Sequence, residues 1–513
     1  MNVIFFITDQ QRADHLGCAG NPILKTPHID QLAGEGMRFP KAYVTNPTCM
    51  PNRASIMTGL YPNMCVRSFG VNLPENIPTF SGVLREQGYV TKAIGKMHLH
   101  FWSNKVDKSN RSAEYLNGWF NEKTHVRMVE NFPKPYYGFD EVDLVVGHGD
   151  CCNGHYEDWL AERAPEYIPT IKELGGKLLS DIYRQSPIPE ELYPTSYLTD
   201  RAVDFLERYG KGDYGEKPFF LKVSYPDPHH PCTPPGKYAE RYKPEDMELP
   251  PSFHDLEAIK KHQFIGPRRD HPFLGKMMLR TSQEEETRNF ISHTYGMITM
   301  IDDSVGQILR TLDKLGLTDN TMIVYTSDHG DMMGDHGMIL KGPLPFNGIL
   351  NVPLIWKVPG LTEPGSVSEA LISAVDLAPT ILNLCQVDPK AQPPDIQGID
   401  ITPVLKDPRA KVRDCCFIEI DEADNGLARA MPIITEAFGN MEMRIKYLVT
   451  ERYSLTIYNG LKGYGDLFDR LNDPEELNNL WFSNPDLRHE LIEKLLQEMI
   501  NTQDLYPKKQ AMA

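Results

Sequence analysis

The sequence predicts an α/β fold in which helices flank a central sheet, with a smaller unit after it. Short apolar runs that are rich in strand-forming residues, such as 219–225 and 321–325, alternate with longer amphipathic stretches, such as 197–209 and 295–315. This alternation is typical of a sheet covered by helices. The chain has 513 residues, more than one hydrophobic core usually organises, so two units are expected.

The boundary between these units is expected near Leu405. A helix-like segment at 374–384 is followed by a proline-rich stretch, which ends the helix and indicates passage toward another unit. We therefore divide the chain into a large domain, 1–405, and a C-terminal subdomain, 406–513. Strand-like runs and one helix predict a small α+β unit with an antiparallel sheet in the second part: 416–420, 444–450, 454–458 and the helix 487–500.

The stretch 104–192 has no clear periodicity and is rich in aromatic, proline and charged residues. We interpret it as excursions over the sheet rather than as part of it. Loops of this kind commonly carry substrate choice.

Composition excludes several classes of partner. The formal charge of −17 opposes binding to a polyanion, so no nucleic-acid partner is expected. No apolar run approaches the roughly 20 residues that span a bilayer, and the first residues lack the features of an export signal, so no membrane association is expected. The nine cysteines are an odd number and include two adjacent pairs, which favours a reducing cytoplasm over a disulfide framework.

Polar side chains follow three of the predicted strands, 3–7, 219–225 and 321–325. Because ligands of open α/β sheets sit at the carboxyl ends of the strands, these distant segments are expected to converge on one site. The clusters are Thr8-Asp9-Gln10, Asp227-Pro228-His229-His230 and Ser327-Asp328-His329. Taken singly, strand-end aspartates more often cap turns than bind a metal.

The segment that begins at Cys49 is expected to place this residue at a helix N-terminus. Pro51 suits the first turn of a helix, and Gly59 suits its end. The free N–H groups of that terminus, together with Arg53 one turn later, would hold a tetrahedral oxyanion such as sulfate or phosphate. A cysteine near an arginine is by itself more often an inert thiol.

The motif Cys49-x-Pro51-x-Arg53, followed by Ala54-Ser55 and Thr58-Gly59, resembles the signature of the sulfatase family in the alkaline phosphatase superfamily. Asn52 stands where the family usually has serine. The segments Thr26-Pro27-His28-Ile29-Asp30 and Gly36-Met37-Arg38-Phe39 are also similar to the family. The resemblance implies an alkaline-phosphatase-like mixed sheet, a catalytic domain at 1–405, and a nucleophile made by oxidising Cys49 to formylglycine with the help of a formylglycine-generating enzyme.

The resemblance also implies one divalent metal ion, held by strand-end residues and by the modified residue 49. Oxygen ligands favour Ca²⁺, which we prefer, or Mg²⁺, whereas the imidazole also admits Mn²⁺. The implied ligands are Asp9, Gln10, Asp328, His329 and Cys49, with Gln10 in place of a second aspartate.

Further catalytic groups follow from the same resemblance. Residues two apart on an extended chain point the same way, so Lys96 and His98 are expected to face one site. In Gly95-Lys96-Met97-His98 the resemblance makes His98 the base that deprotonates the second hydroxyl of the nucleophile. Lys96 would orient that hydroxyl or contact sulfate. His229, preferred over His230, would protonate the leaving alcohol oxygen or bind the sulfate oxygen next to it. Lys341, at the end of a segment similar to the family's Gly-Asp-His-Gly stretch, would offset charge on the transferred group.

These inferences predict a hydrolase of small-molecule sulfuric esters, similar to arylsulfatases. A phosphonate monoester or phosphodiester hydrolase on the same scaffold is the nearest alternative, because Gln10 and the Asp328-His329 pair resemble that subgroup. If Cys49 stayed unmodified, the chain would be an anion- and metal-binding protein. The resemblance is compatible with a homo-oligomer, and the sequence does not indicate the alcohol half of the substrate.

Overall fold

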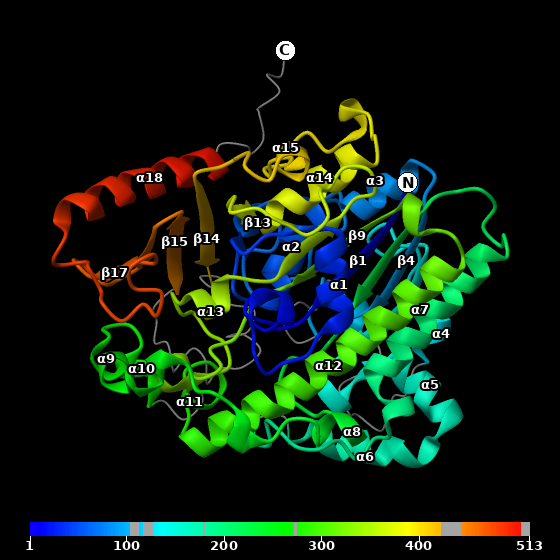
Figure 1. The fold of residues 1–513 in the computed structure, drawn as a ribbon, viewed down its shortest axis with the longest axis horizontal. Helices are drawn as coiled ribbons and strands as arrows, with labels where there is room; N and C mark the ends of the chain where they lie inside the picture. The colour runs from blue at the N-terminus through cyan, green and yellow to red at the C-terminus, as the bar shows by residue number, and fades with distance from the viewer. Residues whose placement is uncertain (103–111, 116–126, 178–179, 271–273, 422–442, 504–513) are drawn as a thin grey trace.

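A nine-stranded mixed sheet forms the centre of the computed structural model, which describes residues 1–102, 112–115, 127–177, 180–270, 274–421 and 443–503 (Figure 1). The order is β12-β2-β11-β9-β1-β7-β4-β5-β6. Strands β1, β9, β7, β4 and β5 run parallel to one another, and β11 is antiparallel to both of its neighbours. The strands are β1 (Asn2–Thr8), β2 (Met37–Arg38), β4 (Val90–Gly95), β5 (Glu141–Val146), β6 (Asn153–Gly154), β7 (Phe219–Ser224), β9 (Thr321–Ser327), β11 (Leu354–Lys357) and β12 (Ser366–Val367).

Both faces of this sheet are buried, as the alternating side chains of β1 show. Val3 and Phe5 belong to one hydrophobic core, whereas Ile4 and Phe6 belong to another on the opposite face. A strand buried on both faces reads as a continuous apolar run, which is how β1 appears in the sequence.

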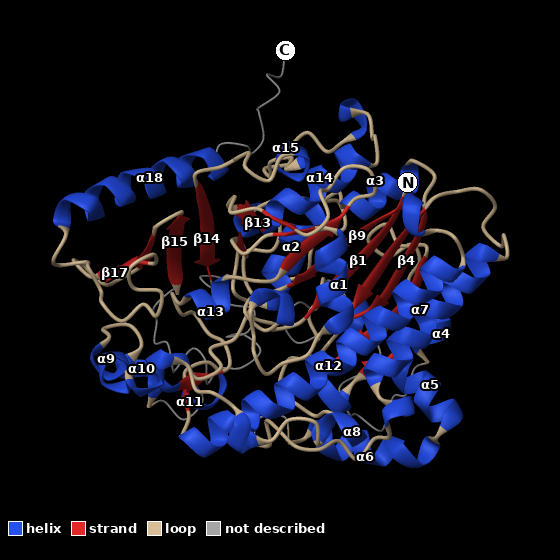
Figure 2. Cartoon of the chain, in the orientation of Figure 1, coloured by secondary structure: helices blue, strands red, loops and turns tan. Residues whose placement is uncertain are grey.

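Helices cover the two faces of the sheet and complete a three-layer arrangement (Figure 2). The first core contains side chains of α2 (Cys49–Thr58), α3 (Phe80–Glu86), α14 (Leu377–Leu384) and α15 (Thr402–Lys406). The second contains side chains of α1 (Pro27–Glu35), α5 (His155–Arg163), α7 (Pro194–Gly210) and α12 (Glu284–Lys314). The predicted α/β class is confirmed. Among the described residues, every helix is too short or too polar to cross a bilayer.

The interpretation of 104–192 as excursions outside the sheet is wrong. Strand β5 lies in this stretch and pairs in parallel with β4. Its acidic residues interrupt the apolar pattern, but Lys92 on β4 reaches across to Asp143 at 2.6 Å and to Glu141 at 3.4 Å. A charge on one strand that is neutralised by its neighbour leaves no signal in the strand's own sequence.

The C-terminal part forms a second, four-stranded antiparallel sheet beside the central one (Figure 1). Alternate residues of β14 face in opposite directions: Cys416 and Ile418 join the core of the large sheet, whereas Cys415 and Phe417 pack toward α18. This arrangement confirms the predicted antiparallel sheet with one helix. Its elements are β14 (Cys415–Asp421), β15 (Arg444–Thr450), β16 (Tyr453–Tyr458), β17 (Gly465–Asp469) and α18 (Pro485–Gln503).

Candidate active site

Two neighbouring parallel strands end at the same edge of the sheet and bring their polar residues together. Asp9 and Gln10 follow β1, and Asp328 and His329 follow β9, which pairs with β1 along its whole length. The Gln10 N–H donates to Asp328 Oδ1 at 3.1 Å. All four side chains are buried. The expected convergence of strand ends is therefore found here.

Cys49 lies at the start of α2, as predicted, and its side chain points into this edge of the sheet. Gly59 ends the helix with φ +71°, a conformation that glycine adopts without a steric penalty. Cys49 Sγ lies 3.2 Å from His329 Nε2 and 3.9 Å from Asp9 Oδ1. The thiol is 3% exposed.

Arg53, one turn later in α2, is held by the acidic residues of the site. Its Nε donates to Asp328 Oδ2 at 2.6 Å and its Nη1 donates to Ser224 Oγ at 2.8 Å. Its Nη2 lies 3.5 Å from Asp9 Oδ2 and, within the described parts of the chain, makes no hydrogen bond. The guanidinium therefore orients the carboxylates and keeps one nitrogen for another acceptor.

Lys341 reaches Cys49 from a separate segment. It follows β10 (Met338–Ile339), and the left-handed Leu340, with φ +71°, turns the chain back toward the site. The half-buried ammonium donates to Cys49 Sγ at 2.9 Å and to His329 Nε2 at 2.5 Å. A positive charge therefore lies directly beside the predicted nucleophile.

These charges favour an anion at residue 49. Burial alone would raise the pKa of Asp9, but Lys96 and other neighbouring cationic groups hold that pKa well below its ordinary value. Burial and the charge of Asp9 raise the pKa of the Cys49 thiol, whereas the charges of Lys341 and Lys96 lower it, and the net change is downward. The site is thus built to stabilise negative charge.

The same residues fit a divalent cation. Four side chains place ligand atoms within 4.8 Å of one another: Asp9, Cys49, Asp328 and His329. His329 Nδ1 donates to the carbonyl of Gly330 at 3.0 Å, which leaves the Nε2 lone pair toward the cluster. Gln10 Oε1 is buried and has no hydrogen-bond partner among the residues that the structure describes. Carboxylate, amide and imidazole donors suit calcium, magnesium or manganese.

Lys96 and His98 do not lie on one extended strand, so the geometry expected for them is wrong. Strand β4 ends at Gly95, and His98 has φ +53°. Lys96 points to the site and donates to Asp9 Oδ2 and to His148 Nε2. The His98 ring stacks on Trp102 at 4.0 Å, and neither of its nitrogens has a hydrogen-bond partner in the described ranges.

Burial lowers the pKa of His98 well below its ordinary value, and the charges of Lys96 and Arg53 act in the same direction. The imidazole is therefore neutral near pH 7 and has a lone pair available to accept a proton.

The two histidines after β7 differ in their contacts. His229 Nδ1 donates to the carbonyl of His230 at 2.6 Å, so its Nε2 is the free end of the ring. His230 Nδ1 instead lies 3.1 Å from Gln10 Nε2. Ligand atoms of Asp9, His148 and His229 lie within 4.8 Å of one another, which places His229 at the edge of the acidic cluster.

His148 is the residue that the sequence analysis missed. It follows β5, so the rule that ligands gather at strand ends would have found it had β5 been recognised. Its ring is 7% exposed and stacks on His229 with a centroid distance of 3.6 Å and an interplanar angle of 9°. Burial, followed by the charge of Lys96, lowers its pKa to about 3.

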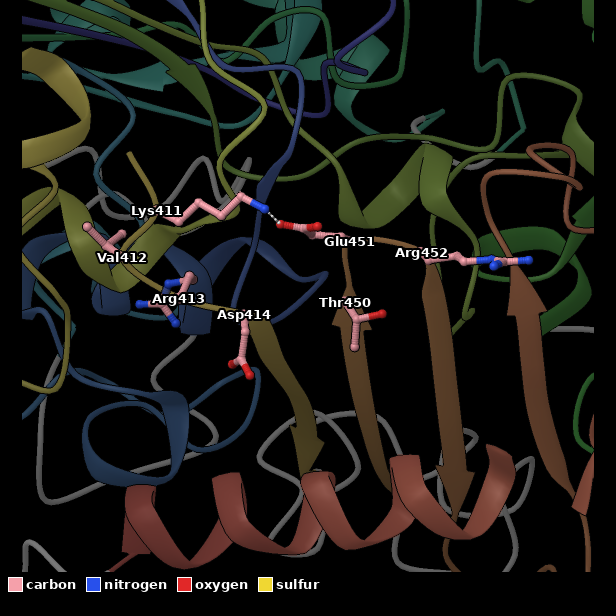
Figure 3. A pocket seen from close by; sticks show the side chains of 7 residues that line it. All are labelled: Lys411, Val412, Arg413, Asp414, Thr450, Glu451 and Arg452. Carbon is pink, nitrogen blue, oxygen red and sulfur yellow. Dashed lines mark hydrogen bonds and ion pairs between the residues drawn. The ribbon is translucent and has the colours of Figure 1, made fainter. Parts of the chain in front are cut away.

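A hollow of about 620 Å³ lies elsewhere, where the chain enters β14 and turns between β15 and β16 (Figure 3). Its basic side chains are already paired: Lys411 with Glu451, Arg413 with Asp376 and Arg452 with Asp469. It shares no residue with the cluster around Cys49, and we assign it no part in the chemistry.

Comparison with known proteins identifies the family of this chain. Residues 1–387, well over half of the sequence, match the sulfatase family profile. The chain belongs to the sulfatase family. As a sulfatase it is a hydrolase that acts on sulfate esters. Residues 334–504 also match the profile of the C-terminal region of N-sulphoglucosamine sulphohydrolase.

Individual relatives of this sulfatase agree with that assignment. It is 29% identical to an arylsulfatase of Clostridium perfringens over 93% of this chain and 90% of the relative. It is 32% identical to the multifunctional alkaline phosphatase superfamily protein PehA of Trinickia caryophylli, over 74% of this chain and 73% of the relative. The fold matches a phosphonate monoester hydrolase of Agrobacterium radiobacter with a TM-score of 0.76 and 24% identity, covering 98% of this chain and 96% of the other.

Proposed function

We propose that this sulfatase hydrolyses small-molecule sulfuric esters with a nucleophile derived from Cys49 by oxidation to formylglycine, and with one divalent cation. The observation that carries the proposal is the position of Cys49 at the start of α2, with its Sγ among the carboxylates that follow β1 and β9. The helix N-terminus and the adjacent cationic side chains would bind the oxygens of a sulfuryl group, and the acidic cluster would bind a metal ion.

The proposed metal ligands are side chains that meet around residue 49: Asp9, Gln10, Asp328 and His329. We propose calcium, because most of the donors are oxygens, with magnesium or manganese as alternatives. When bound, the cation would offset the acidic charges and lower the pKa of an oxygen ligand. Arg53 keeps Asp328 in orientation through its Nε contact, and the Gly330 carbonyl does the same for His329.

Formylglycine would supply a hydrated aldehyde, one hydroxyl of which would serve as the nucleophile toward sulfur while the other would permit later release of sulfate. The chain's own cations surround the position where the sulfuryl oxygens would lie. Lys341 Nζ lies 2.9 Å from Cys49 Sγ, and Lys96 Nζ donates to Asp9 Oδ2. Arg53 Nη2 lies 3.5 Å from Asp9 Oδ2 and has no hydrogen bond among the described residues. These groups offset the charge that develops on the transferred group.

Proton transfer falls to two histidines. His229 uses its Nδ1 on the His230 carbonyl, so Nε2 is the atom that would protonate the leaving alcohol. Burial lowers the pKa of His229 well below its ordinary value, and a bound anionic ester would raise it again. His98, neutral and unpartnered in the described structure, would accept the proton of the remaining hydroxyl when sulfate leaves.

Hydrolysis of phosphonate monoesters or phosphodiesters is a second candidate activity. Gln10 and the Asp328-His329 pair resemble enzymes of that subgroup, and PehA is 32% identical to this chain. The presence of both Lys96 and His98 favours sulfate esters, because phosphonate hydrolases typically lack the Lys-x-His pair.

The test is steady-state hydrolysis of 4-nitrophenyl sulfate and of 4-nitrophenyl phenylphosphonate by enzyme co-expressed with a formylglycine-generating enzyme. A larger kcat/KM for the sulfate, abolished in Cys49→Ala, supports the proposal. A larger value for the phosphonate favours the second candidate. Activity that survives in Cys49→Ala would exclude residue 49 as the nucleophile.

A further inference from the structure

The loop after β5 is shaped to bring His148 against the turn that carries His229. Glycines flank His148 on both sides, and Gly147 and Gly149 have φ of +100° and +54°. A Cβ at residue 149 would lie 2.5 Å from the Pro231 carbonyl oxygen and 2.6 Å from Thr233 Oγ1. Only glycine permits this approach.

A hydrogen bond fixes the two segments together. The Asp150 N–H donates to Thr233 Oγ1 at 2.9 Å, and Thr233 lies two residues after Pro231. Asp150 itself is held by Arg184, which pairs with its carboxylate. The position of His148 relative to the His229 turn is therefore set by the two residues that follow it, Gly149 through close packing and Asp150 through its hydrogen bond.

The imidazole of His148 lies near Trp102 and Asp9, with its Nε2 3.6 Å from Asp9 Oδ2, and it contacts two of the groups proposed for catalysis. Its face lies on the face of His229, with centroids 3.6 Å apart and planes 9° apart. Its Nε2 lies 2.7 Å from Lys96 Nζ. Because an ammonium can only donate, Nε2 accepts this bond and the ring proton sits on Nδ1. One ring thus contacts both the proposed leaving-group acid and a proposed sulfate contact.

We propose that His148 is a positioning residue of this sulfatase, which sets the ring plane of His229 by stacking and the direction of the Lys96 ammonium by accepting its hydrogen bond. The inference rests on the roles proposed above for His229 and Lys96. His148 would then have two separable roles. The face of its ring orients His229, which acts on the leaving alcohol, and its Nε2 orients Lys96, which acts on the sulfuryl oxygens.

Two substitutions separate these roles. His148→Phe keeps a ring that can stack on His229 but removes the acceptor for Lys96. His148→Gln keeps an amide oxygen that can accept from Lys96 but removes the ring. His148→Ala removes both. The matched control is His15→Phe, because His15 is equally buried, at 7% exposure, and its ring packs against Tyr295 and lies near Asp14 rather than in the site.

The readout is kcat/KM for a series of aryl and alkyl sulfates whose leaving alcohols differ in pKa. Loss of the stacking face should penalise poor leaving groups most, so His148→Gln steepens the dependence on leaving-group pKa. Loss of the acceptor should lower kcat/KM by a similar factor for every ester, so His148→Phe shifts the whole series down. Misplacement of a catalytic group by about 1 Å costs up to about 100-fold, which is the scale expected for His148→Ala.

Folding and the proposed function are controlled in the same experiment. Thermal unfolding of each variant shows whether loss of activity follows loss of fold, and wild-type activity with its loss in Cys49→Ala shows whether the proposed function holds. Unchanged kcat/KM and an unchanged leaving-group slope in all three variants, beside an active wild type, would overturn the role of His148.

A crystal structure of His148→Ala decides the geometry whatever the activity. Displacement of the His229 ring or the Lys96 ammonium from the wild-type position is expected. If both groups keep their positions without His148, the inference is wrong.

Discussion

Asn52 Nδ2 donates a hydrogen bond to the main-chain carbonyl of Asp328 over 2.6 Å. Its Oδ1 accepts from both the N–H and the hydroxyl of Thr45, at 2.9 Å each. Asn52 is fully buried, so this side chain ties the helix that carries Cys49 to the end of the strand that carries Asp328.

Replacing Asn52 by alanine should therefore lower the free energy of unfolding by about 2 kcal/mol or more, because buried donors and an acceptor lose their partners. Urea denaturation measures this change. Asn289→Ala is the control, since the side chain of that half-buried residue bonds only within α12 and its loss should change stability by less than about 0.5 kcal/mol. Equal changes in the free energy of unfolding for the two substitutions would contradict the proposed link between the helix and the strand end through Asn52.

Lys341→Met should lower kcat/KM for 4-nitrophenyl sulfate by about 100-fold or more, because it removes a preorganised charge beside residue 49. Lys390→Met, at an exposed position outside the site, should leave activity unchanged. The two variants are compared after circular dichroism has shown that both are folded. A loss below about threefold in Lys341→Met would remove this residue from the charge-offsetting set.

Removal of divalent cations should lower both activity and melting temperature, and calcium should restore both. Without a cation the carboxylates of Asp9 and Asp328 repel each other, and an ion at 100 times its dissociation constant stabilises the fold by about 2.7 kcal/mol. Thermal shift after dialysis against a chelator measures this.

Asp328→Asn should abolish the calcium-dependent shift. Asp303→Asn is the control, because Asp303 belongs to a second acidic group, with His28 and Asp302, whose members already have protein partners. A calcium shift that persists in Asp328→Asn, or disappears in Asp303→Asn, would place the ion elsewhere.

Mass spectrometry of the tryptic peptide that contains residue 49 should show the aldehyde or its hydrate when the chain is co-expressed with a formylglycine-generating enzyme. The thiol should remain in the peptide that contains Cys415 and Cys416, because those residues lie outside the signature motif. Turnover per molecule should scale with the converted fraction. Full turnover in a preparation that keeps the Cys49 thiol would show that formylglycine is not required.

Glu476 predicts a pH dependence of stability. It is 5% exposed, and burial raises its pKa from 4.5 to about 7, although the Asn347 N–H and the charge of Arg470 act in the opposite direction. A carboxyl with a raised pKa contributes stability that is fully present below the unfolded value, near 4.5, and is lost as pH rises through about 7.

The stability of Glu476→Gln relative to the wild type should therefore increase as pH rises from 5 to 9. The difference between their free energies of unfolding should change by about 3 kcal/mol over this range. Urea denaturation at several pH values measures the difference. Glu490→Gln on the exposed face of α18 should show no such trend. If the free energy of unfolding of the wild type and of Glu476→Gln changed with pH in the same way, the Glu476 carboxyl would have an ordinary pKa.

The strands that carry Asp9, His229 and Asp328 could be predicted because each is an apolar run buried on both faces, and such runs are visible without knowledge of the fold. The helix that begins at Cys49 was equally visible, since Pro51 and Gly59 mark its two ends. Local chemistry determines these elements, and the sequence therefore predicts them well.

His148 and the backbone at His98 could not be predicted in the same way. The position of His148 depends on β5, whose acidic residues are neutralised by Lys92 on the neighbouring strand. Lys92 is 49 residues away in the sequence from Glu141, one of these acidic residues. His98 adopts φ +53° where extended backbone was expected, and the Glu114 carboxylate accepts the N–H groups of His98, Leu99 and His100. Both features are set by contacts between segments that are distant in the sequence.

The burial of Cys49 has a consequence for maturation. A modifying enzyme must bind an accessible, extended segment, but in the folded protein this residue is 3% exposed, starts a helix and contacts groups from two strand ends. The proposed oxidation of residue 49 would then have to precede closure of α2 onto the sheet. Folding and that modification would compete in time, so conditions that speed folding of the N-terminal half are expected to yield more molecules that are correctly folded but inactive.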